Sequence, residues 1–466
     1  MRVCLILEGS YPYVYGGVSN WTHQFIQAMP EIEFVLWCIG AKAENKGKYK
    51  YTLPKNVTQV YEVFLDDALR LRNKRGKIPR LKKEEFIQLT NLLECKNVDW
   101  SILFDLFQNK KMNPTALLMS ATFMKALVNL CKEKYPFVPF ADLFHTFRSM
   151  ILPELHILTS EVPKADIYHA TATGYSGLLG SLAKWKYEKK FILTEHGIYT
   201  REREEELLRA KWVAPCFKQQ WIDLFYNFSN CAYSHADVIT ALFERANNIQ
   251  AELGADPKKL RAFANGVHYD RFCDIPIKEE NGHIDIGAVV RIAKIKDIKT
   301  LIYAFAELKV ECANARLHIL GDVDDEVYYE ECKRLVEQLH IEDVFFTGVV
   351  NVIDYMKDLD FTVLSSISEG QPLSVLESFA ARRPCVTTDV GCCRELLEGN
   401  GEDNLGKAGI CIPPMHKEEL ERAMYRLSID ETMRKQMGEI GQKRVKQYYM
   451  HEISMNRYRK LYYEEK

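Results

Sequence analysis

Two basic residues stand five positions apart after a predicted strand in the second half of the chain. The strand ends at Val290, Arg291 and Lys296 follow it, and a predicted helix begins near Asp297. Two fixed cations beside the N–H groups of a helix N-terminus can bind a diphosphate. Considered alone, the segment could equally be a solvated surface loop.

Two carboxylates, Glu369 and Glu377, follow another predicted strand. Pro372 suits the first position of the next helix, where a missing N–H group costs little. Glu369 then lies in the loop before the helix, and Glu377 lies a little more than one turn inside it. Such a pair can accept hydroxyl hydrogen bonds from two parts of one ligand, for example a hexose and a ribose.

Three further positions could approach a ligand in the first half of the chain. Gly16 and Gly17 follow the first predicted strand, where glycine lets the backbone come close to a phosphate or a sugar. A lone Gly-Gly pair is, however, usually only a turn. His196 follows another predicted strand, and a lone histidine at a strand end is more often structural.

The elements that position these residues form an α/β pattern. Short apolar runs rich in Val, Ile and Phe alternate with longer segments of helical period, which is typical of parallel sheets covered by helices. The predicted strands of a first sheet are residues 3–7, 34–39, 167–170 and 191–194, and those of a second are residues 285–290, 317–320, 344–347, 361–365 and 385–388.

Residues 272–283 are polar and turn-rich, as expected of a linker. We therefore predict an N-terminal domain over residues 1–277 and a C-terminal domain over residues 284–440. A C-terminal helix over residues 441–466 is expected to pack back towards the N-terminal domain.

Residues 66–160 interrupt the alternation, because their period is mostly helical and they contain no convincing strand. This segment is predicted to be a helical insertion in the first domain. It opens with a cluster of Lys and Arg between Arg70 and Lys83. The cluster is either a solvated loop or a docking segment for an anionic membrane surface or a membrane-protein partner.

Composition limits the possible classes of function. A chain of 466 residues, 47% hydrophobic and 27% charged, is long enough for two domains. The net charge of −2 gives no indication of a nucleic-acid partner. Thirteen cysteines without paired spacing indicate reduced thiols. With no signal peptide and no membrane span apparent, we expect a cytoplasmic protein that is at most peripheral at the cytoplasmic membrane face.

Taken together, these motifs resemble those of family 4 glycosyltransferases, which have the GT-B fold of two Rossmann-like domains facing a central cleft. The resemblance covers essentially the whole chain. More narrowly, residues 194–203, the helical insertion and residues 368–373 are similar to the glycosyltransferases that make the Pel exopolysaccharide of biofilms. The matching motifs are Gly16-Gly17-Val18, Thr194-Glu195-His196-Gly197, Asn265-Gly266-Val267, Arg291 with Lys296, and Glu369 with Glu377.

The resemblance implies a role for each matching position. Arg291 and Lys296 would bind the donor diphosphate, Glu377 the ribose hydroxyls and Glu369 the hexose hydroxyls. His196 would orient the donor sugar near the reacting carbon. The remaining donor-binding positions would be Gly16, Gly17, Gly370, Gln371, Leu373 and Ser374.

Two departures from the family pattern limit this transfer of roles. Gln371 and Pro372 stand where Phe and Gly are common in the family, and Pro372 has no backbone N–H group to donate to a sugar. Ala264 and His268 flank the Asn265-Gly266-Val267 motif, where Pro and Asp are commoner. The first departure affects sugar recognition, and the second affects a turn.

The implied activity is retaining transfer of a hexose or an N-acetylhexosamine to a growing exopolysaccharide. The donor would be a nucleotide-sugar, UDP-glucose or a UDP-N-acetylhexosamine, and neither a metal nor a cofactor would be needed. The Asp-rich residues 322–325 are then a solvated turn. The expected partners are the polysaccharide acceptor and inner-membrane proteins of polysaccharide synthesis and export. The alternatives are a nucleotide-sugar-binding regulatory subunit of a membrane synthase and a nucleotide-sugar epimerase.

Overall fold

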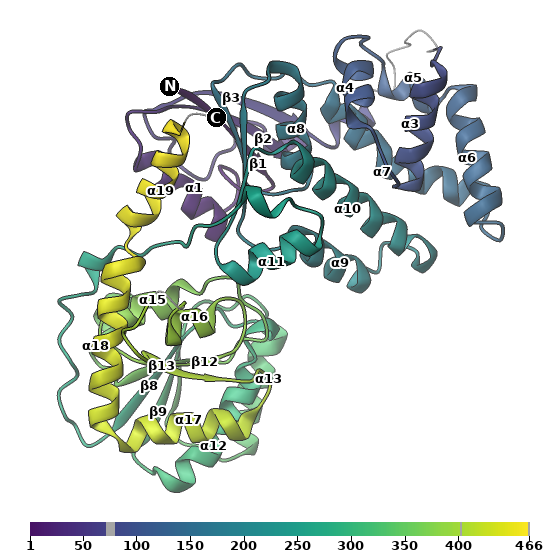
Figure 1. Ribbon diagram of the computed structural model, residues 1–466. Coiled ribbons are helices and arrows are strands. Elements are labelled where there is room, and N and C mark those ends of the chain that lie inside the picture. Colours follow the sequence, from purple (N-terminus) through teal and green to yellow (C-terminus); the bar gives the residue numbers. More distant parts are fainter. Residues whose placement is uncertain (71–79, 401–402, 465–466) are drawn as a thin grey trace. The chain divides into compact units, whose positions relative to one another are not determined.

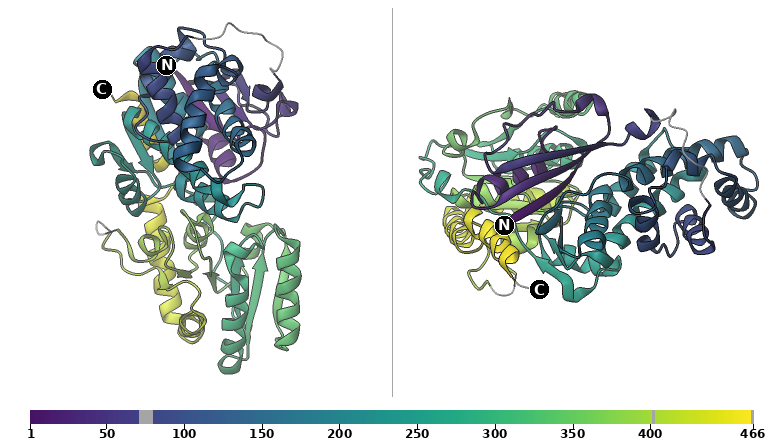
Figure 2. Two further views of the ribbon diagram at one scale, coloured as in Figure 1. Left: turned by 90° about the vertical axis from the view of Figure 1, so that its right-hand side faces the viewer. Right: turned by 90° about the horizontal axis from the view of Figure 1, so that it is seen from above.

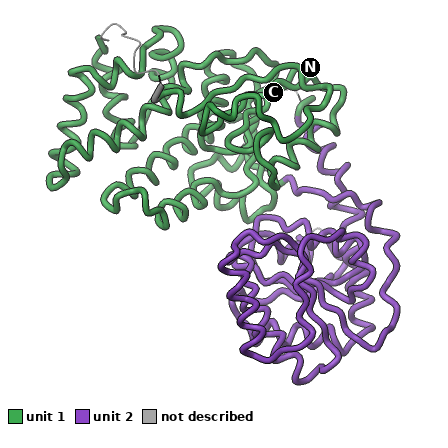
Figure 3. The backbone as a smooth tube through the Cα atoms, turned by 180° about the vertical axis from the view of Figure 1, so that it is seen from behind, with its two compact units in different colours: residues 1–262, 462–466 green, residues 263–461 purple. Residues whose placement is uncertain are grey.

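The protein consists of two units, each built around one parallel sheet (Figure 1, Figure 3). Its structure is a computed structural model that describes residues 1–70, 80–400 and 403–464. Unit 1 comprises residues 1–262 and 462–466, and unit 2 comprises residues 263–461. Within each unit, helices lie on both sides of the sheet (Figure 2).

The described part of unit 1 contains a seven-stranded sheet in the order β3-β2-β1-β4-β5-β6-β7. The central strands are almost continuous apolar runs and are buried, as parallel strands covered on both faces must be. Neighbouring strands all pair in parallel. The strands are β1 (Arg2–Glu8), β2 (Glu33–Gly40), β3 (Val57–Phe64), β4 (Ile167–Ala170), β5 (Lys190–Glu195), β6 (Val238–Ala241) and β7 (Leu260–Ala262).

The helices that cover this sheet approach it closely through small residues. On α8, a Cβ atom at Gly177 would lie 2.8 Å from the Ala232 side chain, and one at Gly180 would lie 2.3 Å from the Phe191 ring. Glycine therefore sets the packing distance of α8 from α10 and from β5. The covering helices are α1 (Gly17–Gln27), α8 (Tyr175–Tyr187), α9 (Tyr199–Arg209), α10 (Lys218–His235) and α11 (Glu244–Glu252).

A group of helices lies between β3 and β4 in the chain, as predicted for the insertion. Polar N-caps begin several of them: Asp99 accepts a hydrogen bond from the Ser101 amide at 3.0 Å, and Ser120 accepts one from the Phe123 amide at 3.1 Å. Half of the basic cluster expected between residues 70 and 83, at positions 72, 74, 75 and 77, lies outside the described residues. The helices are α2 (Asp67–Arg70), α3 (Lys83–Glu94), α4 (Trp100–Gln108), α5 (Pro114–Leu118), α6 (Ala121–Lys134) and α7 (Phe140–Leu158).

The described part of unit 2 contains a six-stranded parallel sheet in the order β10-β9-β8-β11-β12-β13, the strand order of a Rossmann fold. Helix α12 packs against α13 and α17, and α15 packs against α18. The strands are β8 (Ile284–Val289), β9 (Ala315–Leu320), β10 (Val344–Gly348), β11 (Phe361–Leu364), β12 (Cys385–Thr388) and β13 (Gly409–Ile412). The helices are α12 (Ile298–Glu311), α13 (Glu326–Gln338), α14 (Val352–Met356), α15 (Leu373–Ala380), α16 (Cys393–Glu398), α17 (Lys417–Ile429), α18 (Glu431–Tyr448) and α19 (His451–Tyr463).

The units do not divide where composition predicted a linker. Unit 2 begins at Phe263, ahead of the polar segment 272–283. The residues between Phe263 and that segment pack within unit 2. Val267 forms a parallel bridge with Met450, and Phe272 and Ile275 are buried. At the other end, the tyrosine hydroxyl of Tyr462 bonds with a ring nitrogen of His169 at 2.6 Å within unit 1. The predicted 441–466 segment is therefore shared between the units.

None of the helices in the described ranges combines the length and the apolar character needed to cross a bilayer.

Candidate functional site

Polar residues gather where the strand order of the unit 2 sheet reverses, between β8 and β11. Parallel sheets of this kind bind ligands outside the carboxyl ends of the strands at such a switch point. Arg291 and Lys296 follow β8, and Glu369 follows β11. The predicted basic and acidic residues therefore reach the same edge of one sheet.

Lys296 and Glu369 form an ion pair at this edge. The Lys296 Nζ lies 2.5 Å from Glu369 Oε1, and the two side chains are only 16% and 12% exposed. The Ser366 hydroxyl donates to the same carboxylate oxygen at 2.6 Å. The sequence suggested separate contacts for the two charged residues, to a diphosphate and to a hexose, but in the structure they bind each other.

Backbone hydrogen bonds tie together the two loops that carry this pair. The Ile367 amide donates to the Ile295 carbonyl at 2.8 Å, and the Ser365 hydroxyl donates to the Lys296 carbonyl at 2.9 Å. Gly391 has a φ of +55° and packs against this loop, since a Cβ atom there would lie 2.2 Å from the Gly370 carbonyl oxygen. The ion pair is thus held on a fixed frame.

Arg291 is placed differently from Lys296. Its guanidinium lies 2.7 Å from Asp324 Oδ2, and both side chains are more than half exposed. The bridge between Ile292 and Val323 brings the two segments together. The Asp-rich turn therefore supplies a counter-ion for Arg291, while Asp325 caps α13 by accepting a hydrogen bond from the Tyr328 amide. In the described part of the chain, no group of three or more His, Cys, Asp and Glu side chains could hold a metal ion.

Glu377 lies in the second turn of α15, which begins at Leu373, one residue later than predicted. Burial raises the pKa of its carboxyl group to about 7, and the positive charge of Arg271 opposes this rise. The carboxyl group is therefore close to half protonated at neutral pH. Of the other predicted donor-binding residues on this segment, Gly370 and Ser374 are half-buried, and Leu373 is exposed.

Gln371, which was predicted to bind the donor, hydrogen-bonds to Asn265 of another predicted motif. Its side-chain carbonyl accepts a hydrogen bond from the Asn265 amide at 2.7 Å, and its side-chain amide donates to the Asn265 carbonyl at 3.1 Å. At the next residue, Gly266, a Cβ atom would lie 2.2 Å from the Met450 carbonyl oxygen. The Asn265-Gly266-Val267 motif therefore connects the Glu369 loop to the chain near residue 450 within unit 2.

The remaining predicted residues belong to unit 1. His196 follows β5, is half-buried, and packs edge-on against Trp21 of α1 at a ring-centroid distance of 4.4 Å. Burial lowers its pKa to about 4, so the imidazole is neutral at physiological pH. Among the described residues its Nε2 atom has no hydrogen-bond partner. Gly16 and Gly17, at the start of α1, are exposed, with no atom close to the position of a Cβ.

A buried carboxylate missed by the sequence reasoning fixes the turn that carries His196. Glu195 accepts hydrogen bonds from the Tyr233 hydroxyl and the Gln250 amide, both at 2.8 Å, and from the Thr173 hydroxyl and the Tyr199 amide, both at 3.3 Å. Its signal in the sequence was its place in the Thr194-Glu195-His196-Gly197 motif, which assigned it no role. Three of the four partners, Thr173, Tyr233 and Gln250, come from distant segments, so their convergence could not be read from spacing.

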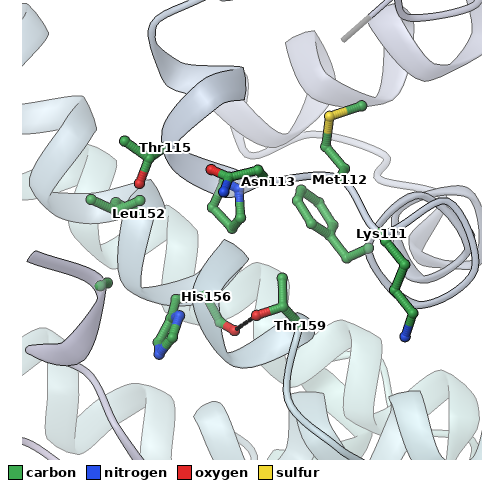
Figure 4. Close-up of a pocket in the computed structure, with 10 residues that line it drawn as sticks. Lys111, Met112, Asn113, Thr115, Leu152, His156 and Thr159 are labelled. Atoms are coloured by element: carbon green, nitrogen blue, oxygen red, sulfur yellow. Dashed lines mark hydrogen bonds between the residues drawn. The ribbon is translucent and has the colours of Figure 1, made fainter. Parts of the chain in front are cut away.

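A separate pocket of about 230 Å³ lies within the helical insertion (Figure 4). Its lining includes Lys111, Asn113 and Thr115, together with Leu152, His156 and Thr159 of α7 and the turn after it. None of the predicted site residues lines it. The pocket is therefore distinct from both groups of predicted site residues.

Comparison with known proteins agrees with these two units. Residues 1–258 match the family model "Domain of unknown function (DUF3492)", and residues 275–444 match the model "Glycosyl transferases group 1". The chain is 27% identical over 227 residues to the alpha-monoglucosyldiacylglycerol synthase of Streptococcus pneumoniae, covering 43% of this chain and 49% of that protein. It is 26% identical over 247 residues to the N-acetyl-alpha-D-glucosaminyl L-malate synthase of Bacillus anthracis, covering 51% of this chain and 62% of that protein. The chain thus spans about half to two-thirds of the length of these relatives.

Solved structures confirm the predicted fold. The structure of Anabaena Alr3699/HepE in complex with UDP has a TM-score of 0.62 at 13% identity and covers 99% of both chains. Sucrose-phosphate synthase from Thermosynechococcus elongatus has a TM-score of 0.61 at 14% identity, covering 99% of this chain and 98% of that one. Both likenesses concern the fold, which is α/β and GT-B, with two Rossmann-like units. The chain belongs to the family described as domain of unknown function DUF3492, and its second unit carries a glycosyl transferases group 1 domain.

Proposed function

We propose that this protein is a metal-independent, retaining glycosyltransferase. It would transfer a hexose or an N-acetylhexosamine from a UDP-sugar to a growing exopolysaccharide, of the Pel type. The observation that carries the proposal is the Lys296–Glu369 ion pair at the switch point of a glycosyl transferases group 1 domain. It sets a cation and a hydroxyl-binding carboxylate side by side, as a sugar joined to a diphosphate requires.

The predicted residues could bind each part of the donor. Lys296 would exchange its bond with Glu369 for one with the diphosphate, which would leave the carboxylate to accept hydrogen bonds from the hexose hydroxyls. Arg291 is exposed and paired only at the surface, so it can turn from Asp324 to the diphosphate at little cost. Glu377 would bind the ribose hydroxyls. Gly370, Gln371, Leu373 and Ser374 would form the loop around the donor.

The remaining predicted groups belong to unit 1. The open start of α1 at Gly16 and Gly17 can approach a phosphate through backbone N–H groups. His196 has a neutral imidazole whose Nε2 is buried and has no hydrogen-bond partner among the described residues, so it could accept a hydrogen bond from a sugar hydroxyl that reaches it. Both groups lie at the carboxyl edge of the unit 1 sheet.

The chemistry would be a front-face displacement that retains the anomeric configuration. The acceptor oxygen forms its bond to the anomeric carbon on the face from which the diphosphate departs, and the departing phosphate oxygen takes the acceptor proton. No protein nucleophile is needed. The negative charge that grows on the diphosphate is stabilised by the fixed cations Arg291 and Lys296.

The relatives suggest the acceptor class. Among them are the putative colanic acid biosynthesis glycosyltransferase WcaL of Salmonella typhimurium and the capsular polysaccharide biosynthesis glycosyltransferase CapM of Staphylococcus aureus. A polysaccharide acceptor also fits partners among the membrane proteins of polysaccharide synthesis and export. The protein would then work in the cytoplasm, at the inner face of the membrane, without a cofactor.

A panel of nucleotide-sugars tests this proposal. The true donor, at 100 times its Kd, should stabilise the protein by about 2.7 kcal/mol in thermal unfolding. The same donor should release its nucleotide on incubation, and NMR of the product should show the anomeric configuration of the donor. Binding without consumption, even with membrane fractions added, would favour the regulatory subunit. Conversion of the donor into its sugar epimer would favour the epimerase.

A further inference from the structure

Exposed Phe and Trp side chains of unit 1 are concentrated around two loops. Among the described residues of that unit, the Phe and Trp side chains that are more than about one-third exposed are Phe137, Phe140 and Trp212. Phe137 is 98% exposed and Trp212 is 69% exposed. Phe137 lies between α6 and α7, Phe140 is the first residue of α7, and Trp212 lies between α9 and α10 (Figure 1).

The two loops are neighbours in space. The ring of Tyr135 lies 5.4 Å from that of Phe217, and its hydroxyl donates to Gln220 Oε1 at 3.1 Å. Lys134 Nζ donates to the same oxygen at 3.1 Å. Phe137 follows Tyr135 closely, and Trp212 precedes Phe217 on the same short loop. The exposed rings therefore belong to one surface, called here the aromatic patch: residues 132–140 and 208–218.

The patch is fixed from beneath. Val213 and Phe217 are buried, with 4% and 2% exposure, although Trp212 beside them projects into solvent. The Trp212 ring packs edge-on against Trp221 of α10 at 5.6 Å. The buried residues anchor the loop, so the exposed ring cannot turn inward without displacing them. A large apolar side chain held outward in this way marks an interaction surface.

Lys and Arg outnumber acidic residues within the patch. It contains Lys132, Lys134, Arg209, Lys211 and Lys218 and one acidic residue, Glu133. Arg209 pairs with Glu205 of α9 at 2.5 Å, and Glu206 and Asp142 lie just outside the patch, so its net positive charge comes from the lysines. Trp and Phe beside Lys and Arg are typical of protein segments at the membrane–water interface, where the rings enter the headgroup region and the cations meet anionic lipids.

We propose that the aromatic patch binds the surface of an anionic lipid bilayer, with Phe137 and Trp212 as the inserting side chains. The rings protrude from loop ends, which suits insertion between headgroups. A peptide or helix partner is more commonly received in a groove. This surface differs from the basic cluster near residues 70–83 that the sequence suggested, and it does not depend on the proposed transferase activity.

Co-sedimentation of the full chain with lipid vesicles tests the proposal. One set of vesicles is phosphatidylcholine alone, and the other is phosphatidylcholine and phosphatidylglycerol in equal parts. The protein should bind the anionic vesicles, and high salt should weaken this binding because it screens the lysines. Phe137→Ser and Trp212→Ser should each lower the partition constant on the order of tenfold, whereas Trp212→Phe should retain most of it.

Val310→Ser is the matched control, because Val310 is 85% exposed on α12 of unit 2. It should bind vesicles like the unchanged protein, and all variants should unfold at similar temperatures. Equal binding by Phe137→Ser, Trp212→Ser and the control would overturn the proposal. Binding to native membranes but not to vesicles, abolished by protease treatment of those membranes, would also overturn it and would assign the patch to a protein partner.

Discussion

Lys296 Nζ and Glu369 Oε1 lie 2.5 Å apart at the reversal point of the unit 2 sheet, although 73 positions separate them in the chain. Neither side chain is more than 16% exposed. Removing one partner of such a pair leaves a poorly solvated charge behind. The pair therefore holds both side chains in position at the proposed donor site.

Lys296→Ala should lower kcat on the order of 100- to 1000-fold. As the glycosidic bond breaks, the departing phosphate gains charge, so a cation there stabilises the transition state more than the bound donor. Steady-state kinetics with the identified donor measures the effect. If Lys296→Ala raised only KM while Glu377→Ala abolished turnover, the roles assigned to these residues would be wrong.

Arg291 and Asp324 give a second, separable test. Arg291→Ala should lower kcat to a similar degree, because Arg291 is the other proposed diphosphate ligand. Asp324→Asn should leave kcat unchanged and lower KM slightly, since it removes the carboxylate that competes for Arg291. The pair is exposed, so neither change should alter stability by more than about 1 kcal/mol. A large loss of kcat in Asp324→Asn would indicate that the aspartate has a direct part in the reaction.

Glu377 should make donor binding depend on pH. Its pKa of about 7 means that the carboxyl group is protonated below neutrality and loses its capacity as a charged acceptor for ribose hydroxyls. KM should therefore rise as the pH falls below about 7, with kcat little changed, and Glu377→Gln should have a high KM without this inflection. If the inflection of KM near pH 7 persisted in Glu377→Gln, it would arise from the titration of another group.

The same shift has a consequence for stability. The unfolded carboxyl group loses its proton near 4.5, but the folded one keeps it up to about 7. Glu377 therefore contributes stability below about pH 4.5 that is lost as the pH rises to about 7. Thermal unfolding of Glu377→Gln should lack this loss. Comparing the unfolding temperatures of the unchanged protein and Glu377→Gln at about pH 4.5 and about pH 7 measures this loss of stability without any substrate.

The local parts of the site were predictable from sequence, and its long-range contacts were not. The positions of Glu369 before α15 and Glu377 inside it follow from a strand, a proline and an apolar helix that are contiguous in the chain. The bonds from Gln371 to Asn265 join residues 106 positions apart. Pairing between such distant segments depends on which strands become neighbours in the sheet. The spacing of residues along the chain does not determine this strand order.

The fold shows the same division. The long buried strands were predicted to within one or two residues because their apolar runs are nearly continuous. The strands β3, β6, β7 and β13 were missed. β3 is a half-exposed edge strand with polar residues, and the other three have only three or four residues each. Length alone does not explain why these three were missed, because β4, β11 and β12 also have four residues each and were predicted.

Chelation should not abolish activity. If Arg291 and Lys296 neutralise the diphosphate, a divalent ion has no necessary part in the reaction. Nucleotide release should continue in EDTA at close to its rate without the chelator. Loss of activity in EDTA that magnesium or manganese restores would require a different account of how the diphosphate is bound.

His196 should act as a neutral acceptor and not as a titrating base. Burial lowers its pKa to about 4, so the imidazole remains uncharged from pH 5 upward. Its unpartnered Nε2 could then accept a hydrogen bond from a sugar hydroxyl. His196→Ala should therefore lower kcat/KM by roughly tenfold, the value of one hydrogen bond, by the same factor at every pH from 5 to 9. The inflection near pH 7 assigned to Glu377 should persist in this variant.

The pH dependence of stability tests His196 independently, because its pKa shift affects stability in the opposite direction from that of Glu377. The unfolded histidine binds a proton near pH 6.5, whereas the folded one does not until about pH 4. His196 therefore contributes stability above about pH 6.5 that is lost as the pH falls towards 4, and His196→Ala should lack this part of the acid destabilisation. If the loss of kcat/KM in His196→Ala instead grew or vanished across pH 6 to 7, the histidine would be titrating in that range, and its role as a neutral acceptor would have to be abandoned.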